Sequence, residues 1–170
     1  AAFHASSAPS NYTELSGRFL GPGNRAHIAN GTFLSDLSIW DIYRSQAPLL
    51  SMVWPEQSAQ LVDSMLKIAK IGGALPRWML ANIYAGSMVG NHANVIIYDA
   101  FARDVPRDAH AAFFHMSQSI RNASLPHAHR GAALLDAWLK KGYLPDNLGE
   151  SRSAAVALDW ALDDHVTAQM

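Results

Sequence analysis

"PEQSAQLVDSMLKIAKIGG", residues 55–73, is the most regular helical pattern in the chain and decides the fold class. Pro55 opens the pattern, because the first helical turn does not need the amide hydrogen that proline lacks. Glu56 follows, where a negative charge faces the positive end of the helix dipole. The apolar residues that recur at helical spacing are Leu61, Met65 and Ile68. Two glycines end the pattern, so the stretch predicts an amphipathic helix with one buried face.

The same periodicity predicts further helices on both sides of this one. They are expected at about residues 40–53, 91–103, 130–141 and 151–170, with another that begins at Pro106 and extends over Ile120. Pro48 is expected to kink or divide the first of them. The apolar stripe of the last is predicted to consist of Ala154, Leu158, Ala161 and Val166. Residues 1–8 resemble the end of one more helix.

Two segments depart from the helical pattern. Within the loop-rich residues 10–35, "GPGN" lies between "RFL" and "AHI" and predicts a short β-hairpin. Residues 72–92 contain Gly, Pro and Asn too often for one regular element, yet they carry Trp78, Tyr84 and several Met and Leu residues. A connection this rich in large apolar groups is expected to pack into the wall of a cleft.

These patterns predict a mainly α chain with a short β-hairpin and loop region near residues 17–35. The 170 residues have the size of one domain, in which residues 1–35 form the loop-rich part and residues 36–170 the helical part. Connections of alternating length favour antiparallel helix pairs laid side by side, as in a helical toroid or part of one. The chain lacks an initiator Met and stops inside a helical pattern, so we expect an internal fragment of a longer protein.

Composition excludes several classes of function. Thirteen Lys and Arg residues against 14 Asp and Glu residues leave no basic surplus for phosphates, so nucleic acid is not an expected partner. No apolar run approaches the roughly 20 residues that span a bilayer, and the absence of cysteine excludes disulfides and thiolate metal sites. Three Asn-x-Ser/Thr sequences, at Asn11, Asn30 and Asn122, favour a secretory route slightly.

Asp41 occupies an unexpected place between Trp40 and Ile42, one turn inside an apolar helical pattern. One interpretation is a capping box, in which Ser38 and the Asp41 carboxylate satisfy each other's backbone amides at the start of a helix. The other is a site in which Trp40, Asp41 and Arg44 hold a polar ligand.

Other polar residues have competing interpretations. Asp163 and Asp164 are adjacent, which points their carboxylates about 100° apart on a helix and favours a solvated polar edge over a pair of acids. His127 and His129 could both ligate a metal ion, but no carboxylate lies at a helpful spacing. His92, at a predicted helix start, is either a packing histidine or a ligand for a hydroxyl group.

The remaining polar and aromatic residues share a theme, and they are Trp40, Asp41, Arg44, Trp78, Asn82, Tyr84 and His92. Aromatic faces stack on the apolar face of a sugar ring, while carboxylates, amides and Arg bind its hydroxyl groups. The set therefore suits a carbohydrate. Five Trp residues would equally suit a thick helical core.

The chain resembles glycoside hydrolase family 92, the calcium-dependent exo-α-mannosidases. The resemblance extends over essentially all 170 residues and keeps the motifs in family order. The motifs are "GRFLGPGNRAH", "SDLSIWDIYRSQAPLL", "GGALPRWMLANIYAGSMVGNH", "YDAFARDV", "KKGYLPDN" and "ESRSAAVALDWALDDHVTAQ".

The resemblance implies an enzyme built from an N-terminal β-sandwich and a C-terminal (α/α)6 barrel, with the active site between them. This chain would be the start and roughly the first half of the barrel. Members of the family release terminal α-mannose from glycans with inversion, helped by a bound Ca2+ that engages sugar hydroxyls.

The family's acid, base and a further cleft segment have the patterns Thr-Glu-Gly-Asn, Gly-Asn-Asp-Asp and Gly-Asn-Glu-Pro, and none occurs in this chain. We therefore expect no catalytic residue and no calcium ligand here. The resemblance places Asp41 in the subsite for the terminal mannose. It adds Trp40 and Arg44 as supporting residues, with Trp78 and His92 as further substrate-binding candidates.

Two other functions stay open at this point. The chain could be a noncatalytic carbohydrate-binding helical module, or a purely structural helical domain in which all Trp residues belong to the core. Replacing Asp41 with alanine separates them, because both carbohydrate readings predict loss of sugar binding, whereas a capping Asp41 predicts only a weaker helix start.

Overall fold

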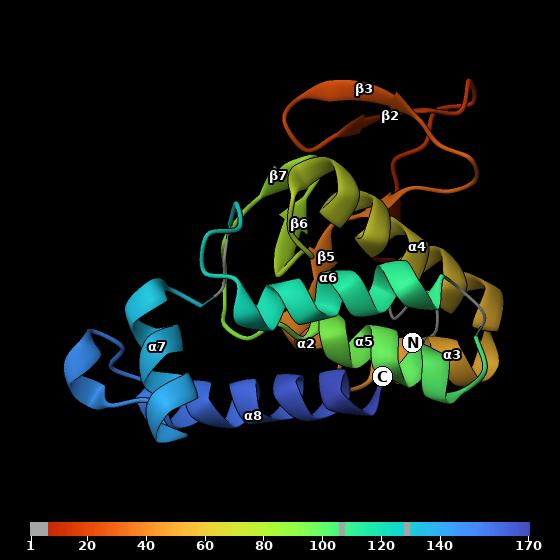
Figure 1. Ribbon diagram of the computed structural model, residues 1–170. Helices are drawn as coiled ribbons and strands as arrows, with labels where there is room; N and C mark the ends of the chain where they lie inside the picture. Colours follow the sequence, from red (N-terminus) through yellow and green to blue (C-terminus); the bar gives the residue numbers. More distant parts are fainter. Residues whose placement is uncertain (1–6, 106–107, 128–129) are drawn as a thin grey trace.

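A computed structural model describes residues 7–105, 108–127 and 130–170 of the chain, and Figure 1 shows the arrangement of its elements. The structure is mainly helical, with small antiparallel sheets beside the helices. In the described part of the chain, no helix combines the length and the apolar character needed to cross a bilayer. The expected mainly α class is therefore confirmed.

The helix predicted from residues 55–73 is α4, Pro55–Gly72. Its inward face is fully buried, and the next residue, Gly73, has a φ of 90°, a left-handed conformation that favours glycine and ends the helix. α4 contacts α3 (Gln46–Val53), α5 (Ala93–Ala102) and α6 (Ala109–Arg121). The main core forms around this helix, as the amphipathic pattern predicts.

The C-terminal helix α8, Ser153–Gln169, runs beside α5 and α6 (Figure 1). A second, smaller core joins it to α7, Ala132–Lys141, and contains Leu144, Val156 and Trp160. A short 3-10 helix, Asp146–Leu148, lies in the connection between α7 and α8.

The predicted apolar stripe of α8 is wrong at three of its four residues, since only Val166 is buried. Leu158 is 74% exposed, and Ala154 and Ala161 are exposed as well. The helix is rotated relative to the expectation, because the residues that it buries beside Val166 are Val156, Trp160, Asp163 and Thr167. The buried face of α8 is therefore the one that carries the large Trp160 ring and the hydrogen-bonded Asp163 carboxylate, and not the one that carries Ala154 and Ala161.

The helix expected over residues 40–53 is divided, but not at Pro48. A short helix, α2, covers Ile39–Ile42, and α3 begins only at Gln46. Pro48 lies in the first turn of α3, where no intrahelical amide bond is lost. The Ser38 side chain makes no capping hydrogen bond, so the capping-box prediction is wrong.

The predicted hairpin is confirmed. Strand β2, Arg18–Gly21, pairs antiparallel with β3, Arg25–Ile28, and Gly23 and Asn24 have the positive φ angles of the turn between them. A second small sheet joins β1, Ser10–Asn11, to β4, Leu34–Ser35.

Residues 72–92 contain a sheet that the sequence pattern did not predict. Strands β6, Trp78–Leu80, and β7, Ile83–Tyr84, form a hairpin, and β6 also pairs with β5, Leu37–Ser38. Leu37 and Met79 face each other across the sheet and are fully buried. This sheet fixes the start of α2 against the core.

The remaining helix boundaries differ modestly from the predictions. The helices expected at 91–103, 130–141 and 151–170 begin at Ala93, Ala132 and Ser153. α6 begins at Ala109, because the side chain of extended Asp108 accepts a hydrogen bond from the Ala111 amide and caps the helix. Pro106 lies outside the described residues, as do residues 1–6 of the helix end expected at residues 1–8, and the described Ser7 and Ala8 are not helical.

Candidate functional site

The short helix α2 and the turn that follows it place Trp40 and Arg44 side by side. The Arg44 guanidinium donates a hydrogen bond from Nη1 to the Trp40 carbonyl oxygen at 2.9 Å. Its carbon Cζ lies 4.5 Å from the centre of the Trp40 ring and 4.4 Å from that of the Tyr43 ring. Both are cation–π distances, so two aromatic rings hold an exposed cation.

Tyr43 extends this arrangement inward. Its ring stacks on the His92 imidazole with 4.1 Å between ring centres and 25° between planes. Burial raises the pKa of the Tyr43 hydroxyl, and Arg44 opposes that rise. The carboxylates of Asp159 and Asp163 raise this pKa further, so the hydroxyl stays neutral at physiological pH. We call Trp40, Arg44, Tyr43 and His92 the aromatic stack.

His92, at the inner end of the stack, is 1% exposed. Its Nδ1 lies 3.0 Å from an oxygen of Asp163, and its Nε2 lies 3.6 Å from Asp159. Gly90 lies against the ring, because a Cβ added there would stand 2.6 Å from Nε2. Contacts on several sides therefore fix the imidazole in place, which agrees with the packing interpretation of this residue.

Asp163 is fully buried, so the predicted solvated edge is wrong for this residue. One oxygen faces His92, and the other accepts a 2.6 Å hydrogen bond from the Asn91 amide. A buried carboxylate is tolerated only with such partners. Asn91 lies two residues before α5, so this bond fastens the segment that leads into α5 to α8, a different part of the chain.

A network of neutral polar groups surrounds this contact. Asn94 donates to the Met116 carbonyl and to Thr167 Oγ1, and it accepts a bond from Ser119. Asn91 donates from its side chain to the Ser119 carbonyl. These bonds tie α5, α6 and α8 together beneath the aromatic stack, and buried networks of this kind specify one arrangement of their helices.

Asp164 points to another side of α8 and is likewise no free surface acid. It lies 2.7 Å from Nη2 of Arg130 and accepts a 2.7 Å hydrogen bond from the Trp138 indole. The Arg130 guanidinium is buried over the ring of Trp160. Asp164 therefore joins α7 and α8, and the two adjacent aspartates serve separate clusters.

Asp41 differs from these buried carboxylates, because its side chain is exposed. No hydrogen bond or ion pair joins it to another residue in the described ranges. It lies on α2 directly after Trp40. The geometry leaves this carboxylate available to a ligand.

Trp78 lies on β6, directly opposite Ser38 of β5. Paired residues in an antiparallel sheet share a face, so half-buried Trp78 lies on the side away from the buried Leu37 and Met79 pair. Since Ser38 immediately precedes α2, the sheet brings Trp78 to the same region as Trp40.

The other members of the predicted polar set have structural roles. The Tyr84 hydroxyl donates to the Ala74 carbonyl, and burial raises the pKa of this group. Asn82 donates to the Asn24 side chain, which connects the two hairpins. His127 stacks on Tyr84, with 4.2 Å between ring centres, and the proposed partner His129 lies outside the described residues.

The described residues do not assemble a metal site. No group of three or more His, Asp or Glu side chains suited to a metal ion occurs within residues 7–105, 108–127 and 130–170. The expectation that calcium ligands lie outside this chain stays a prediction.

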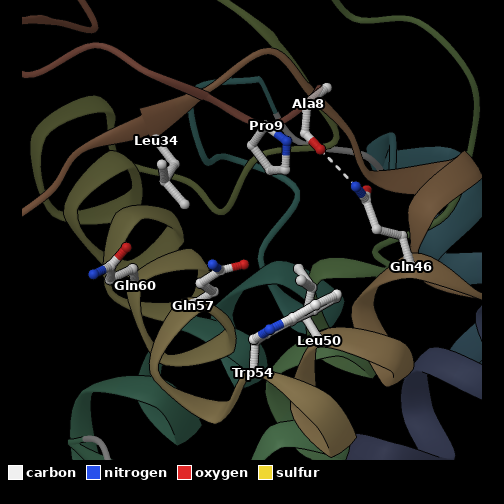
Figure 2. A pocket seen from close by; sticks show the side chains of 8 residues that line it. All are labelled: Ala8, Pro9, Leu34, Gln46, Leu50, Trp54, Gln57 and Gln60. Atoms are coloured by element: carbon white, nitrogen blue, oxygen red, sulfur yellow. Dashed lines mark hydrogen bonds between the residues drawn. The ribbon is translucent and has the colours of Figure 1, made fainter. Parts of the chain in front are cut away.

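A cavity of about 400 Å³ lies between the N-terminal segment and the α3–α4 corner (Figure 2). Its lining includes Trp54, Gln57 and Gln60, and the Gln46 amide donates to the Ala8 carbonyl at its edge. None of its eight lining residues belongs to the predicted site. The candidate site is therefore an open surface at α2 and not this cavity.

Replacing Gly90 with alanine is expected to destabilise the fold by roughly 2–4 kcal/mol, because the new methyl group meets a fixed ring and the residue has a φ of 78°. Urea unfolding measures this loss. Gly23→Ala is the matched control, since Gly23 has a φ of 79° but nothing within 4 Å of an added Cβ. Equal losses in both variants would contradict a specific contact with His92.

Comparison with known protein families identifies the family to which this chain belongs. The glycosyl hydrolase family 92 catalytic domain matches residues 1–170. The chain belongs to glycosyl hydrolase family 92. Among curated proteins, none matches the sequence.

Solved family 92 structures contain the same fold. The α-mannosidase BT3965 from Bacteroides thetaiotaomicron, solved with and without mannoimidazole, is 27% identical and superposes with a TM-score of 0.89. The family 92 inverting mannosidase BT2199 from the same organism is 21% identical, with a TM-score of 0.81. Each match covers 99% of this chain, but only 22% of BT3965 and 25% of BT2199. This family 92 chain thus spans about a fifth to a quarter of the enzymes it matches.

Proposed function

We propose that this chain supplies part of the terminal-mannose pocket of an inverting, calcium-dependent exo-α-mannosidase that releases mannose from glycans. Membership of family 92 and the likeness to BT3965, named an α-mannosidase, support a glycosidase. Two observations carry the pocket: the Asp41 carboxylate is exposed, and Arg44, three residues further along the chain, has its guanidinium held by two aromatic rings.

The chemistry of these side chains suits a hexose. The Asp41 carboxylate can accept hydrogen bonds from two neighbouring hydroxyl groups, and the planar Arg44 guanidinium can donate to sugar oxygens. Trp40 and Trp78 offer apolar ring surface to the C–H face of the sugar. His92 is buried behind Tyr43 and contributes by positioning the stack, without touching the sugar.

The bond-breaking step requires groups that we assign to other parts of the protein. Inversion needs one carboxylic acid that protonates the leaving oxygen and one carboxylate that activates water, about 6.5–9.5 Å apart. The remaining barrel helices and the β-sandwich domain are proposed to complete the site. When bound, Ca2+ would engage sugar hydroxyls and favour ring distortion. The described residues do not fit a calcium site, so we assign none of the ligands of the ion to them.

An assay of the complete natural protein that contains this chain tests the proposal. We expect it to release mannose from 4-nitrophenyl α-mannoside, with the β-anomer appearing first by NMR. Activity should fall on treatment with EDTA and return with Ca2+. The 170-residue chain alone should release none.

The outcomes separate the candidate functions. Binding of mannose without hydrolysis by the complete protein would favour a noncatalytic carbohydrate-binding module, and absence of both would favour a structural domain. Mannose release by the 170-residue chain alone would contradict the assignment of the acid and base to other segments.

A further inference from the structure

We propose that Asp163 is a positioning residue for the sugar pocket, acting from α8 through His92 and Tyr43 on the Arg44 guanidinium. The inference rests on the proposed function, because it concerns how the same pocket is held. It assigns a role in ligand binding to a buried carboxylate that lies far from Asp41 in the sequence and belongs to a different helix.

The first step is the orientation of the imidazole. Asp163 offers one oxygen to the Asn91 amide and the other to Nδ1 of His92, at 2.6 and 3.0 Å. A carboxylate oxygen accepts hydrogen bonds, so Nδ1 of His92 is the donor to Asp163, while Nε2 lies 3.6 Å from Asp159 and against Gly90. These contacts fix the plane of the imidazole.

The second step is the transfer of this orientation to the surface. The fixed imidazole supports the Tyr43 ring at 4.1 Å, and that ring supports Arg44 at 4.4 Å. Gly90 leaves the imidazole no room to tilt away on its Nε2 side. A change at Asp163 therefore alters the surface that carries the guanidinium.

The third step concerns ligand binding. A free arginine side chain samples many rotamers, and a ligand that immobilises it loses affinity. In this chain the two rings and the bond to the Trp40 carbonyl hold Arg44 although it is exposed. A preorganised guanidinium binds a sugar more tightly, so loosening the stack should weaken substrate binding and leave the chemical step unchanged.

Asp163→Asn is the sharpest test. The variant keeps the shape but has one oxygen where Asp163 has two, so it can accept a hydrogen bond from the Asn91 amide or from His92 but not from both, and it carries no negative charge. In the complete natural protein we expect the KM for 4-nitrophenyl α-mannoside to rise about 5- to 10-fold, with kcat changed less than about twofold. Asp164→Asn is the matched control, because Asp164 serves Arg130 and Trp138, and its KM should stay at the wild-type value.

A double-mutant cycle with Arg44→Ala separates positioning from a purely structural role. If Asp163 acts through Arg44, Asp163→Asn should raise KM little further once Arg44 is absent. Additive effects, or a KM unchanged in Asp163→Asn, would overturn the inference. Should Asp163→Asn fail to fold, the same cycle is run with Tyr43→Leu, which removes the stacked ring, against Tyr43→Phe, which keeps it.

The same measurements distinguish this inference from the proposed function. A wild-type protein that neither binds nor hydrolyses α-mannosides contradicts the proposed function, and the inference falls with it. An active wild-type protein whose Asp163 and Arg44 variants behave independently contradicts the inference alone.

Discussion

Asp41→Ala is expected to lower kcat/KM for an α-mannoside roughly 10- to 150-fold in the complete natural protein, while thermal stability stays nearly unchanged. The loss corresponds to the hydrogen bonds of a charged group, which contribute about 1.5–3 kcal/mol. Stability should hold because Asp41 is exposed and engages no other described residue. Steady-state kinetics and a thermal melt of the same samples measure the two effects.

Glu56→Ala is the control for the loss of an exposed acid. Glu56 lies in the first turn of α4, where it interacts favourably with the helix dipole. Its removal should cost a few tenths of a kcal/mol of stability and leave kcat/KM unaltered. If Asp41→Ala instead loses stability and keeps full sugar binding, the residue serves α2 and not a ligand.

Trp160→Ala is expected to lower the free energy of unfolding by roughly 3–5 kcal/mol, the usual range for deleting a buried indole. The Trp160 ring is 1% exposed, meets Trp138 edge-on with 5.8 Å between ring centres, and lies under the Arg130 guanidinium. The substitution would open a cavity beneath a buried cation. Urea unfolding followed by far-UV circular dichroism measures the loss.

Trp54→Ala provides the comparison for this experiment. Trp54 is 41% exposed at the α3–α4 corner, so its removal should cost clearly less than that of Trp160. Similar losses at both positions would show that the α7–α8 core contributes less than its burial implies.

The helices could be predicted from the sequence because each buries one face at a regular spacing. α4 is the clearest case, since its capping residues and its apolar stripe indicate the same bounds. The sheet of β5, β6 and β7 could not be predicted in this way. Its strands are two or three residues long, so no alternation develops, and its pairing joins segments about 40 residues apart.

The candidate site was only partly predictable. Trp40, Asp41 and Arg44 are close in sequence, and they lie on one short helix and the turn directly after it. The sequence analysis did not predict that Asp163 is buried. A signal for this exists, since Val156, Trp160 and Thr167 lie on the same face of α8 and are buried. A carboxylate on an apolar face predicts a buried partner. The identity of that partner, His92, follows only from the tertiary packing of α5 against α8.

The contact between His92 and Asp163 also sets an order of events during synthesis. The two residues are 71 positions apart, and a ribosome that adds about 5–20 residues per second needs roughly 4–14 s to make that length. The helices around α4 can pack in this interval, because their core lies earlier in the chain. The surface arginine, in contrast, is held in its orientation only after α8 has emerged and docked. A ribosome-stalled chain that ends before α8 should therefore have a folded core around α4, while its Arg44 side chain is not yet held in one orientation.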